Sequence, residues 1–361
     1  MEDLLMGLGN PLLDISADVE EDIFQKYDLK PANAILAEEK HIPLYKELVE
    51  NYKVSYIAGG ATQNSIRVAQ WLLQSENSTT YLGCVGKDNF GEELEKAAKQ
   101  DGLLPLYQKI DTHQTGTCAV LVHKNERSLV ANLGAANHFK ITHLEDPVVK
   151  KHFENSLVFY SAGFFITVSP DTLFKMAKFA AENDRVFCMN LSATFLMQGP
   201  FWETMQKLIP YWDIIFGNET EFVAFGKAMK IIGQDESEES ALSKIKDVMK
   251  ALAEMPKINS KMPRGVIATQ GKNPTLVYFK DYKDEVVEFP VELCPKEEFV
   301  DTNGAGDSFV GGFLAQYSLM KKNKKPISIP DCVKAAHYAA GYIIRRSGCS
   351  FSGKPNFELL K

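Results

Sequence analysis

The segment DTNGAGD, from Asp301 to Asp307, places two glycines and a carboxylate directly before an apolar, helix-like stretch, SFVGGFLAQY. Glycine permits backbone conformations and close approaches that a side chain would block, so the amides of Gly304, Ala305 and Gly306 can turn toward an anion. A helix N-terminus adds unpaired N–H groups and a partial positive charge, which stabilise a phosphate and the charged form of Asp307. We interpret the segment as a phosphate cradle beside a general base that is ionised at neutral pH, although a glycine turn with an aspartate cap fits the same letters.

Two segments near the N-terminus carry short polar side chains next to glycines. The first, GLGNPLLDIS, holds Asn10 and Asp14, and the second, AGGATQNS, holds Gly59, Gly60 and Asn64. A carboxylate that accepts two hydrogen bonds, with Asn amides and glycine N–H groups nearby, matches the neighbouring hydroxyls of a sugar. The segments therefore indicate a sugar-hydroxyl site. The alternative is a pair of glycine turns in which Asn and Asp act as caps.

The segment FGNETE, at 216–221, places Asn218 and Glu221 three residues apart, on one side of a first helical turn. Oxygen ligands of this kind suit Mg²⁺, bound directly or through water, because Mg²⁺ keeps much of its hydration and is shared with phosphates. The same spacing also fits a helix N-cap followed by a capping-box acid. Both interpretations stay open, and they can coexist.

The composition excludes several classes of protein. The chain has 361 residues, of which 45% are hydrophobic and 24% charged, and its formal net charge is −7. An acidic balance argues against non-specific binding to nucleic acids, and no apolar run approaches the roughly 18 residues of a membrane span. The six cysteines form no CxxC pair, and the N-terminus lacks the basic region of a secretory signal. We expect a cytoplasmic monomer, with nuclear presence left open, that binds neither nucleic acids nor membranes.

Short apolar runs alternate with helical stretches through most of the chain. Strand-like runs occur at 156–163, 185–193, 211–218 and 264–271, and the residues from Thr115 to Asn132 have the pattern of a β-hairpin. The alternation predicts an α/β fold with a mostly parallel sheet covered by helices on both faces. Active-site residues should gather at the carboxyl ends of its strands, where Asn218, Thr269 to Gly271 and Asn303 fall.

Taken together, the motifs resemble a known family. GNPLLD, AGGATQNS and DTNGAGD are similar to the signature of the ribokinase-like (PfkB) carbohydrate and nucleoside kinases. FGNETE, AGFFITVSP, NLSATF, TGTCA and AAHYAAGYIIRRSGC look most like the branch of that family that phosphorylates adenosine, and the match runs in order from residue 7 to about residue 357. The resemblance implies a ribokinase-like fold, in which a Rossmann-like, mostly parallel central sheet is flanked by helices. The implied large domain covers about residues 1–14, 65–112 and 140–361, and a small α/β lid covers about residues 15–64 and 113–139.

The resemblance also implies a reaction. In the matching branch, the γ-phosphoryl group of ATP moves to the 5′-hydroxyl of adenosine, a purine salvage reaction with Mg²⁺ as cofactor. The residue that matches the catalytic base is Asp307, and those that match the ribose ligands are Asp14, Gly60 and Asn64. Arg127, at the tip of the hairpin, matches an arginine that closes over the transferring phosphate.

The resemblance assigns residues to three further sites. Asn218 and Glu221 would organise Mg²⁺, through water, together with the nucleotide phosphates. The ATP site would be bordered by Asn218, Thr269, Gly271, Asn303 and His337. Phe165 would stack on the base in a purine pocket lined by Leu12, Leu36, Cys118, Leu129, Ala131, Phe165 and Phe195.

Two alternatives remain beside this interpretation. One is a ribokinase-like enzyme that acts on another nucleoside or on a free sugar, and the other is a catalytically silent member that only binds nucleosides. Ala61 stands where many relatives have serine, which removes one side-chain hydrogen bond without changing the reaction class. P-loop and protein kinases are excluded, because the chain has no GxxxxGK[ST], HRD or DFG motif.

Overall fold

The computed structural model describes residues 3–30, 34–123 and 126–360, and these residues form two sheets. The large sheet has nine strands in the order β14-β13-β12-β11-β10-β9-β1-β5-β6, and only the pairs that include β13 are antiparallel. The predicted α/β fold with a mostly parallel sheet is confirmed. The strands are β1 (Leu5–Leu8), β5 (Thr79–Gly86), β6 (Leu104–Ile110), β9 (Val158–Ala162), β10 (Val186–Asn190), β11 (Ile214–Asn218), β12 (Gly265–Gln270), β13 (Asn273–Phe279) and β14 (Lys283–Phe289).

The central strands of the large sheet are apolar on both faces because helices cover both. Successive side chains of a strand point to opposite faces. Tyr160 of β9 and Phe216 of β11 therefore lie in one hydrophobic core, whereas Phe159 of β9 and Ile215 of β11 lie in the other. Near-continuous apolar runs are typical of parallel strands buried in this way.

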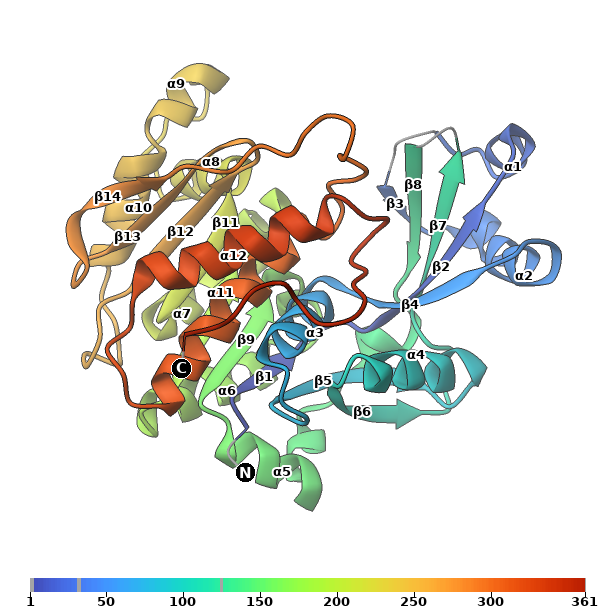
Figure 1. The fold of residues 1–361 in the computed structure, drawn as a ribbon, viewed down its shortest axis with the longest axis horizontal. Coiled ribbons are helices and arrows are strands. Elements are labelled where there is room, and N and C mark those ends of the chain that lie inside the picture. Colours follow the sequence, from blue (N-terminus) through green and yellow to red (C-terminus); the bar gives the residue numbers. More distant parts are fainter. Residues whose placement is uncertain (1–2, 31–33, 124–125, 361) are drawn as a thin grey trace.

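The helices form a layer on each face of the large sheet, and α11 and α12 lie side by side across one of them (Figure 1). That face is covered by α3 (Ala61–Leu73), α11 (Ala305–Lys322) and α12 (Ile329–Ile343). The opposite face is covered by α5 (Pro147–Asn155), α6 (Pro170–Glu182), α7 (Gly199–Leu208), α8 (Glu219–Ala228), α9 (Glu238–Ser243) and α10 (Ile245–Glu254). None of the helices within the described ranges has the length and apolar character needed to cross a membrane.

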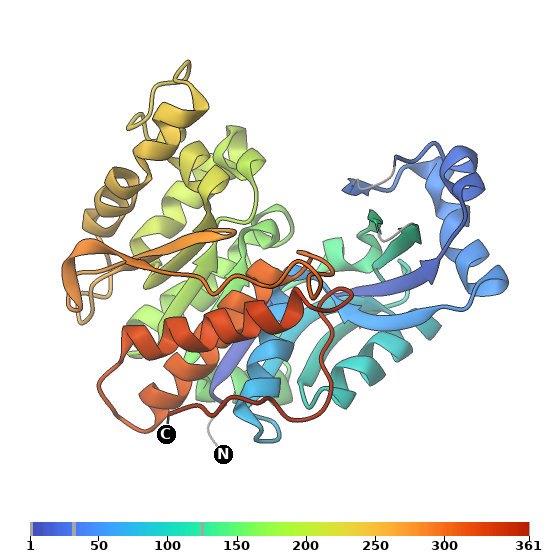
Figure 2. The same ribbon diagram turned by 45° about the horizontal axis from the view of Figure 1, so that its top comes forward.

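The small sheet has five strands in the order β3-β8-β7-β2-β4 and projects to one side of the large sheet (Figure 1 and Figure 2). Along β2, Leu13 and Ile15 are buried, whereas Leu12, Asp14 and Ser16 are half-exposed on the opposite face. The antiparallel pair β7–β8 confirms the predicted hairpin. The strands are β2 (Leu12–Asp18), β3 (Ala34–Leu36), β4 (Ser55–Gly59), β7 (Thr117–His123) and β8 (Glu126–Asn132), and the helices nearby are α1 (Glu21–Lys26), α2 (Ile42–Asn51) and α4 (Asn89–Gln100).

The chain passes between the two sheets at short connections. These connections are residues 9–11 between β1 and β2, Gly60 between β4 and α3, residues 111–116 between β6 and β7, and Leu133 after β8. The carboxyl end of β1 and the start of α3 therefore lie at the junction of the two sheets. The small sheet begins at Leu12, slightly before the lid expected from residue 15, and its action as a lid stays a prediction.

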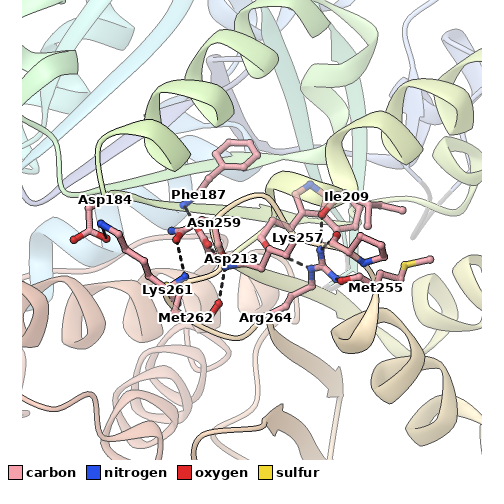
Figure 3. Close-up of polar contacts among 12 residues, drawn as sticks. Asp184, Phe187, Ile209, Asp213, Met255, Lys257, Asn259, Lys261, Met262 and Arg264 are labelled. Carbon is pink, nitrogen blue, oxygen red and sulfur yellow. Dashed lines mark hydrogen bonds and ion pairs between the residues drawn. The ribbon is translucent and has the colours of Figure 1, made fainter.

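A buried ion pair fixes the loop before β12 at the amino end of β11 (Figure 3). Asp213, which is 1% exposed, lies 2.5 Å from Lys257 Nζ and also accepts a hydrogen bond of 2.8 Å from the amide of Phe187. Nearby, the guanidinium of Arg264 donates to the backbone carbonyls of Ile209, Trp212, Leu252, Met255 and Pro256. The buried charges in this arrangement are compensated by each other and by backbone groups. If one charged side chain is removed, its partner is left as an unpaired buried charge, which is strongly destabilising.

Lys257→Met is expected to lower the free energy of unfolding by about 3 kcal/mol, because it leaves the buried carboxylate of Asp213 without its cation. The matched control is Lys261→Met, which removes an ion pair with Asp184 whose side chains are 70% and 61% exposed. That control should change the free energy by less than about 1 kcal/mol. Chemical denaturation at neutral pH measures both values, and equal effects of the two variants would contradict the expectation.

Candidate active site

A turn stabilised by glycine leads into α11 at the carboxyl-end side of the large sheet. Gly304 has φ 77° and ψ 0°, and the amide of Ala305 donates to the carbonyl of Thr302 over 3.1 Å. These values fit a type II turn with glycine in its third position, where a side chain is unfavourable. A Cβ on Gly304 would also lie 2.9 Å from the Cβ of Cys349, so both conformation and space require glycine there.

The first amides of α11 are the groups predicted to bind an anion, and the structure shows which of them are free to do so. Because Ala305 closes the turn, its N–H is engaged with Thr302 in this conformation. The amides of Gly306 and Asp307 are the next in the helix, and residues at these positions have no intrahelical acceptor. Gly306 is exposed, and a Cβ on it would meet no heavy atom within 4 Å. Open space therefore lies beside Gly306, where a phosphate could approach.

Asp307 lies half-buried at the wall of a pocket, and its Oδ2 accepts a 3.0 Å hydrogen bond from Nδ2 of Asn64 on α3. Burial raises the pKa of Asp307 to about 6, and the hydrogen bond from Asn64 opposes that rise. The pKa is therefore raised, although the helix terminus was expected to favour the charged form, because desolvation outweighs the favourable contacts. The carboxyl group is still mostly ionised at neutral pH, and its pKa lies near the value at which a general base is most effective.

The pocket beside Asp307 is built at the carboxyl ends of the central strands of the large sheet. Asn190, Asn218 and Thr269 mark the ends of three neighbouring strands, β10, β11 and β12, and all three line it. Parallel strands bring such residues to one edge of a sheet, as the sequence predicted. The complete lining is Ala61, Tyr160, Ala162, Phe164, Asn190, Ser192, Phe216, Gly217, Asn218, Glu221, Thr269, Gly306, Asp307, Phe309 and Val310.

Asn218 and Glu221 form the capping box that was one of the two interpretations of FGNETE. Asn218 Oδ1 accepts from the Glu221 amide over 2.9 Å, and Glu221 Oε2 accepts from the Asn218 amide over 3.0 Å. Burial is the main cause that raises the pKa of Glu221, and the negative charges of Glu219 and then Asp307 add to it, against hydrogen bonds from the backbone of Asn218 and Ser192. A cation beside Glu221 would favour its ionised form.

The donor set fits Mg²⁺ held mainly through water and phosphate rather than by a full protein cage. Within the described ranges, no group of three or more His, Cys, Asp or Glu side chains is placed to hold a metal. Mg²⁺ usually takes only one or two carboxylates from the protein and shares the phosphates of its nucleotide. Glu221 supplies one such carboxylate at the pocket wall and Asn218 lies beside it, so the second interpretation of FGNETE remains a proposal.

The predicted sugar site lies where β2, β4 and α3 meet. Asp14 on β2 is the neighbour of Ile57 on β4, and a Cβ on Gly59 would overlap the carboxylate of Asp14. Gly60 has φ 96°, and a Cβ there would overlap the backbone oxygen of Asn10. Close packing of backbone against these polar groups explains both glycines. The structure therefore brings Asn10, Asp14, Gly59, Gly60 and Asn64 to one place.

Most of the predicted purine-pocket residues lie on one face of the small sheet. Asp14, Cys118, Ala131 and Leu36 are direct partners across four adjacent strands, and partners across a ladder share a face. Leu129 is on the same face as Ala131, two residues earlier on β8, and Leu12 is on the same face as Asp14, two residues earlier on β2. Leu36 is 66% exposed, so this face has an apolar area open to solvent.

Of the two predicted aromatic residues, only Phe195 is accessible in this conformation. Phe195 is 45% exposed, whereas Phe165 is 1% exposed and packs against Phe139 in the core. The neighbour Phe164, 37% exposed, lines the pocket instead and faces Phe195 at a ring distance of 6.4 Å. The η4 turn (Gly163–Thr167) sends adjacent side chains in different directions, so Phe165 is not placed to stack on a base in this conformation, and Phe164 is the residue that lines the pocket.

The residues predicted around ATP are less closely grouped. Thr269 lines the pocket, but Gly271, Asn303 and His337 are not among the described residues that do. Gly271 lies at the exposed turn between β12 and β13 with φ 56°, and Asn303 is half-buried in the turn before α11. His337 of α12 contacts Thr275 Oγ1 through Nε2 at 2.9 Å. Their role at the nucleotide stays a prediction.

Arg127 is the partner of Val122 in the β7–β8 ladder, and its side chain lies outside the described part of the structure.

Several pocket residues were not singled out from the sequence. Tyr160 lies in the middle of β9 and belongs to no quoted motif. Ser192 belongs to NLSATF, but nothing in that segment marked it out, and its φ of 65°, which is uncommon for a residue other than glycine, cannot be read from the sequence.

Asp307→Asn is expected to stabilise the ligand-free protein at neutral pH by about 1 to 3 kcal/mol, because it removes a desolvated carboxylate. The sign follows from the pKa of about 6, which lies above that of an unfolded aspartate. Stability contributed by the protonated form is lost as the pH rises through 6, so the advantage of the variant should disappear near pH 4. Thermal unfolding at both pH values measures this, and a variant less stable at neutral pH would contradict it.

Comparison with known proteins places the chain in a family. Residues 25–356 match the pfkB family of carbohydrate kinases. Adenosine kinase 2 of Arabidopsis thaliana is 45% identical over 98% of this chain and 97% of its own length. The adenosine kinase of Dictyostelium discoideum is 43% identical over 96% of both chains.

A solved structure shows the same fold. The crystal structure of Anopheles gambiae adenosine kinase, in complex with a di(adenosine-5) tetraphosphate, is 46% identical, with a TM-score of 0.85 and coverage of 99% of this chain and 100% of that one. The two chains are therefore similar in both sequence and fold over nearly their whole length. The chain therefore belongs to the pfkB family of carbohydrate kinases, as its motifs predicted.

Proposed function

We propose that this chain is an adenosine kinase, which transfers the γ-phosphoryl group of ATP to the 5′-hydroxyl of adenosine and releases AMP and ADP. The observation that carries the proposal is the position of Asp307, at the N-terminus of α11, in a pocket and bonded to Asn64. A base, an anion site and a sugar site meet there. Relatives named as adenosine kinases at 43–45% identity over nearly their whole length support the choice of substrate.

Asp307 accepts the proton of the 5′-hydroxyl as the phosphoryl group moves. Phosphoryl transfer has a loose transition state, so position counts for more than base strength, and a carboxylate with a pKa of about 6 is sufficient. The amides of Gly306 and Asp307, at the positive end of α11, stabilise the negative charge that spreads over the transferring group. Arg127 would add a cation from the small sheet, as the family resemblance implies.

Mg²⁺ would be held by Glu221 and Asn218 through water, together with the phosphates of ATP. When bound, it neutralises charge on the phosphates. Thr269 borders the same pocket from β12, while Gly271, Asn303 and His337 would lie further along the nucleotide. In the Anopheles gambiae enzyme, the bound ligand contains two adenosines joined by phosphates, which fits one site for adenosine and one for ATP on either side of the transfer.

Adenosine would bind between the two sheets. Asp14 and the backbone at Gly59 and Gly60 hold the ribose hydroxyls, and Asn64 reaches both the sugar and Asp307. Asn10 Oδ1 is buried and has no hydrogen-bond partner among the described residues, so it is available to a hydroxyl. The base would lie against the apolar face of the small sheet and near Phe164 and Phe195.

The small sheet would close over adenosine as a lid. Its apolar face, with Leu36 66% exposed, would be covered on closure, and water would be excluded from the phosphoryl group.

We also propose that the enzyme acts as a cytoplasmic monomer without nucleic acid or membrane partners. An acidic formal charge of −7 is consistent with that part of the proposal.

Radiolabelled AMP formed from adenosine and ATP tests the reaction directly, and Asp307→Asn tests the base. The variant should keep adenosine affinity within a few-fold but lose at least ~10²-fold in turnover, since a positioned base contributes that much. Phosphorylation of ribose without adenosine would support the sugar kinase alternative. Binding without AMP formation would support the silent alternative, and unchanged turnover of Asp307→Asn would remove Asp307 as the base.

Asp14→Ala should raise the KM for adenosine by about 10- to 100-fold with a smaller effect on turnover, because hydrogen bonds to a charged group are lost in the ground state and the transition state alike. The matched control is Asp18→Ala, an exposed aspartate on the same strand and the same face. Steady-state kinetics compares the two variants. A normal KM for Asp14→Ala would take Asp14 out of the ribose site.

A further inference from the structure

Arg67 of α3 makes buried contacts that lead to Asp307. Its side chain is almost fully buried, with 3% of the residue exposed. Nε donates to Oδ2 of Asp101 over 2.6 Å, and Nη1 donates to Oδ1 of Asn64 and to the carbonyl of Cys349, each over 3.2 Å. The carbonyl of Ala58, on β4 of the small sheet, also accepts from Nη1. The guanidinium is therefore fixed from four directions.

The contact with Arg67 determines which way the amide of Asn64 points. An asparagine side chain has an acceptor oxygen and a donor nitrogen, whereas arginine can only donate. Asn64 Oδ1 faces the guanidinium, so Nδ2 faces Asp307 Oδ2 at 3.0 Å. The flipped amide would set its N–H groups against the guanidinium and its oxygen against the carboxylate, and both contacts would be repulsive. Arg67 and Asp307 thus both favour the same orientation of the Asn64 amide.

We infer that Arg67 is a positioning residue for catalysis: it holds Asn64 in the orientation that donates to the general base Asp307. The inference rests on the proposed function for the role of Asp307 as base. Asn64 can keep this contact while it binds sugar, because its amide nitrogen carries two hydrogens and the second can reach a ribose hydroxyl. Arg67 itself is not among the described residues that line the pocket.

A purely structural role is the competing explanation. Arg67 also links α3 to β4, to the end of α4 through Asp101, and to the C-terminal segment through Cys349, so its loss would lower stability in either case. The two explanations differ in the titration of Asp307. If Arg67 only stabilises the fold, its replacement should leave the titration of Asp307 unchanged. If Arg67 orients Asn64, it controls a hydrogen bond that favours the ionised carboxyl group of Asp307.

The experiment follows the carboxyl carbon of Asp307 by NMR during a pH titration of the ligand-free, full-length protein, with ¹³C-labelled aspartate. The Asp307 signal is identified by its loss in Asp307→Asn. Arg67→Met should move the titration midpoint upward by about half a pH unit or more, as expected for loss of a hydrogen bond to the charged form. The acid limb of kcat/KM for adenosine should move by the same amount.

The matched control is Arg264→Met, which removes a similarly buried arginine that directly precedes β12 and contacts backbone carbonyls near Asp213 (Figure 3). It should lower the melting temperature but leave the Asp307 midpoint in place. Asn64→Ala removes the donor itself, so the double variant Asn64→Ala/Arg67→Met should titrate like Asn64→Ala alone. An additive further shift in the double variant would show that Arg67 does not act through Asn64 and would overturn the inference.

If Arg67→Met does not fold, Arg67→Leu serves in its place, because it also leaves Asn64 Oδ1 without a donor from this position. A folded Arg67→Met or Arg67→Leu variant with the wild-type midpoint would overturn the inference. The titration needs no turnover, so it separates two failures. A shifted midpoint in a protein that forms no AMP would leave the orienting contact standing and would reject the proposed function instead.

Discussion

The site depends on a carboxylate that the protein keeps in a poorly solvated place. Asp307 stands at the N-terminus of α11 on the wall of a pocket, where burial raises its pKa to about 6. The amide of Asn64 and the positive end of the helix limit that rise but do not cancel it. A desolvated carboxylate of this kind costs stability in the free protein at neutral pH. Trade-offs between stability and activity are common at such sites.

The fold holds this carboxylate by bringing distant parts of the chain together. The large sheet delivers Asn218 and Thr269 at the ends of parallel strands, and α3, which begins directly after β4, delivers Asn64. Gly59 and Gly304 allow the close packing of backbone around these groups. The small sheet then presents Asp14 and an apolar face at the same junction. Core packing buries both faces of the large sheet, and the pocket lies at the carboxyl ends of its central strands.

Much of the fold and of the candidate site could be predicted from the sequence, because the polar groups of the site and the glycines beside them lie in short contiguous segments. DTNGAGD and AGGATQNS each contain a polar group and the glycines that give it room, and the alternating strands and helices fix the edge where they meet. Two details could not be predicted. Phe164 and Phe165 are adjacent aromatic residues, and only the turn that carries them decides which one faces the pocket. The pKa of Asp307 depends on burial, which segment patterns do not report.

Arg67 illustrates a different limit of prediction from sequence, because its contacts join parts of the chain that are far apart. Within α3 it looks like one polar residue of an amphipathic helix, and its partners Asp101 and Cys349 lie 34 and 282 residues away in the chain. Only the folded chain shows that these groups surround one guanidinium. The carbonyl of Cys349 also links the C-terminal segment to α3 through Arg67.

A crystal structure with adenosine and a non-hydrolysable ATP analogue tests the central claim most directly. The account predicts that a carboxylate oxygen of Asp307 lies within hydrogen-bond distance, about 3 Å, of the 5′-hydroxyl. It also predicts that the terminal phosphate rests on the amides of Gly306 and Asp307. A carboxylate turned away from the hydroxyl, with the phosphate bound elsewhere, would contradict it.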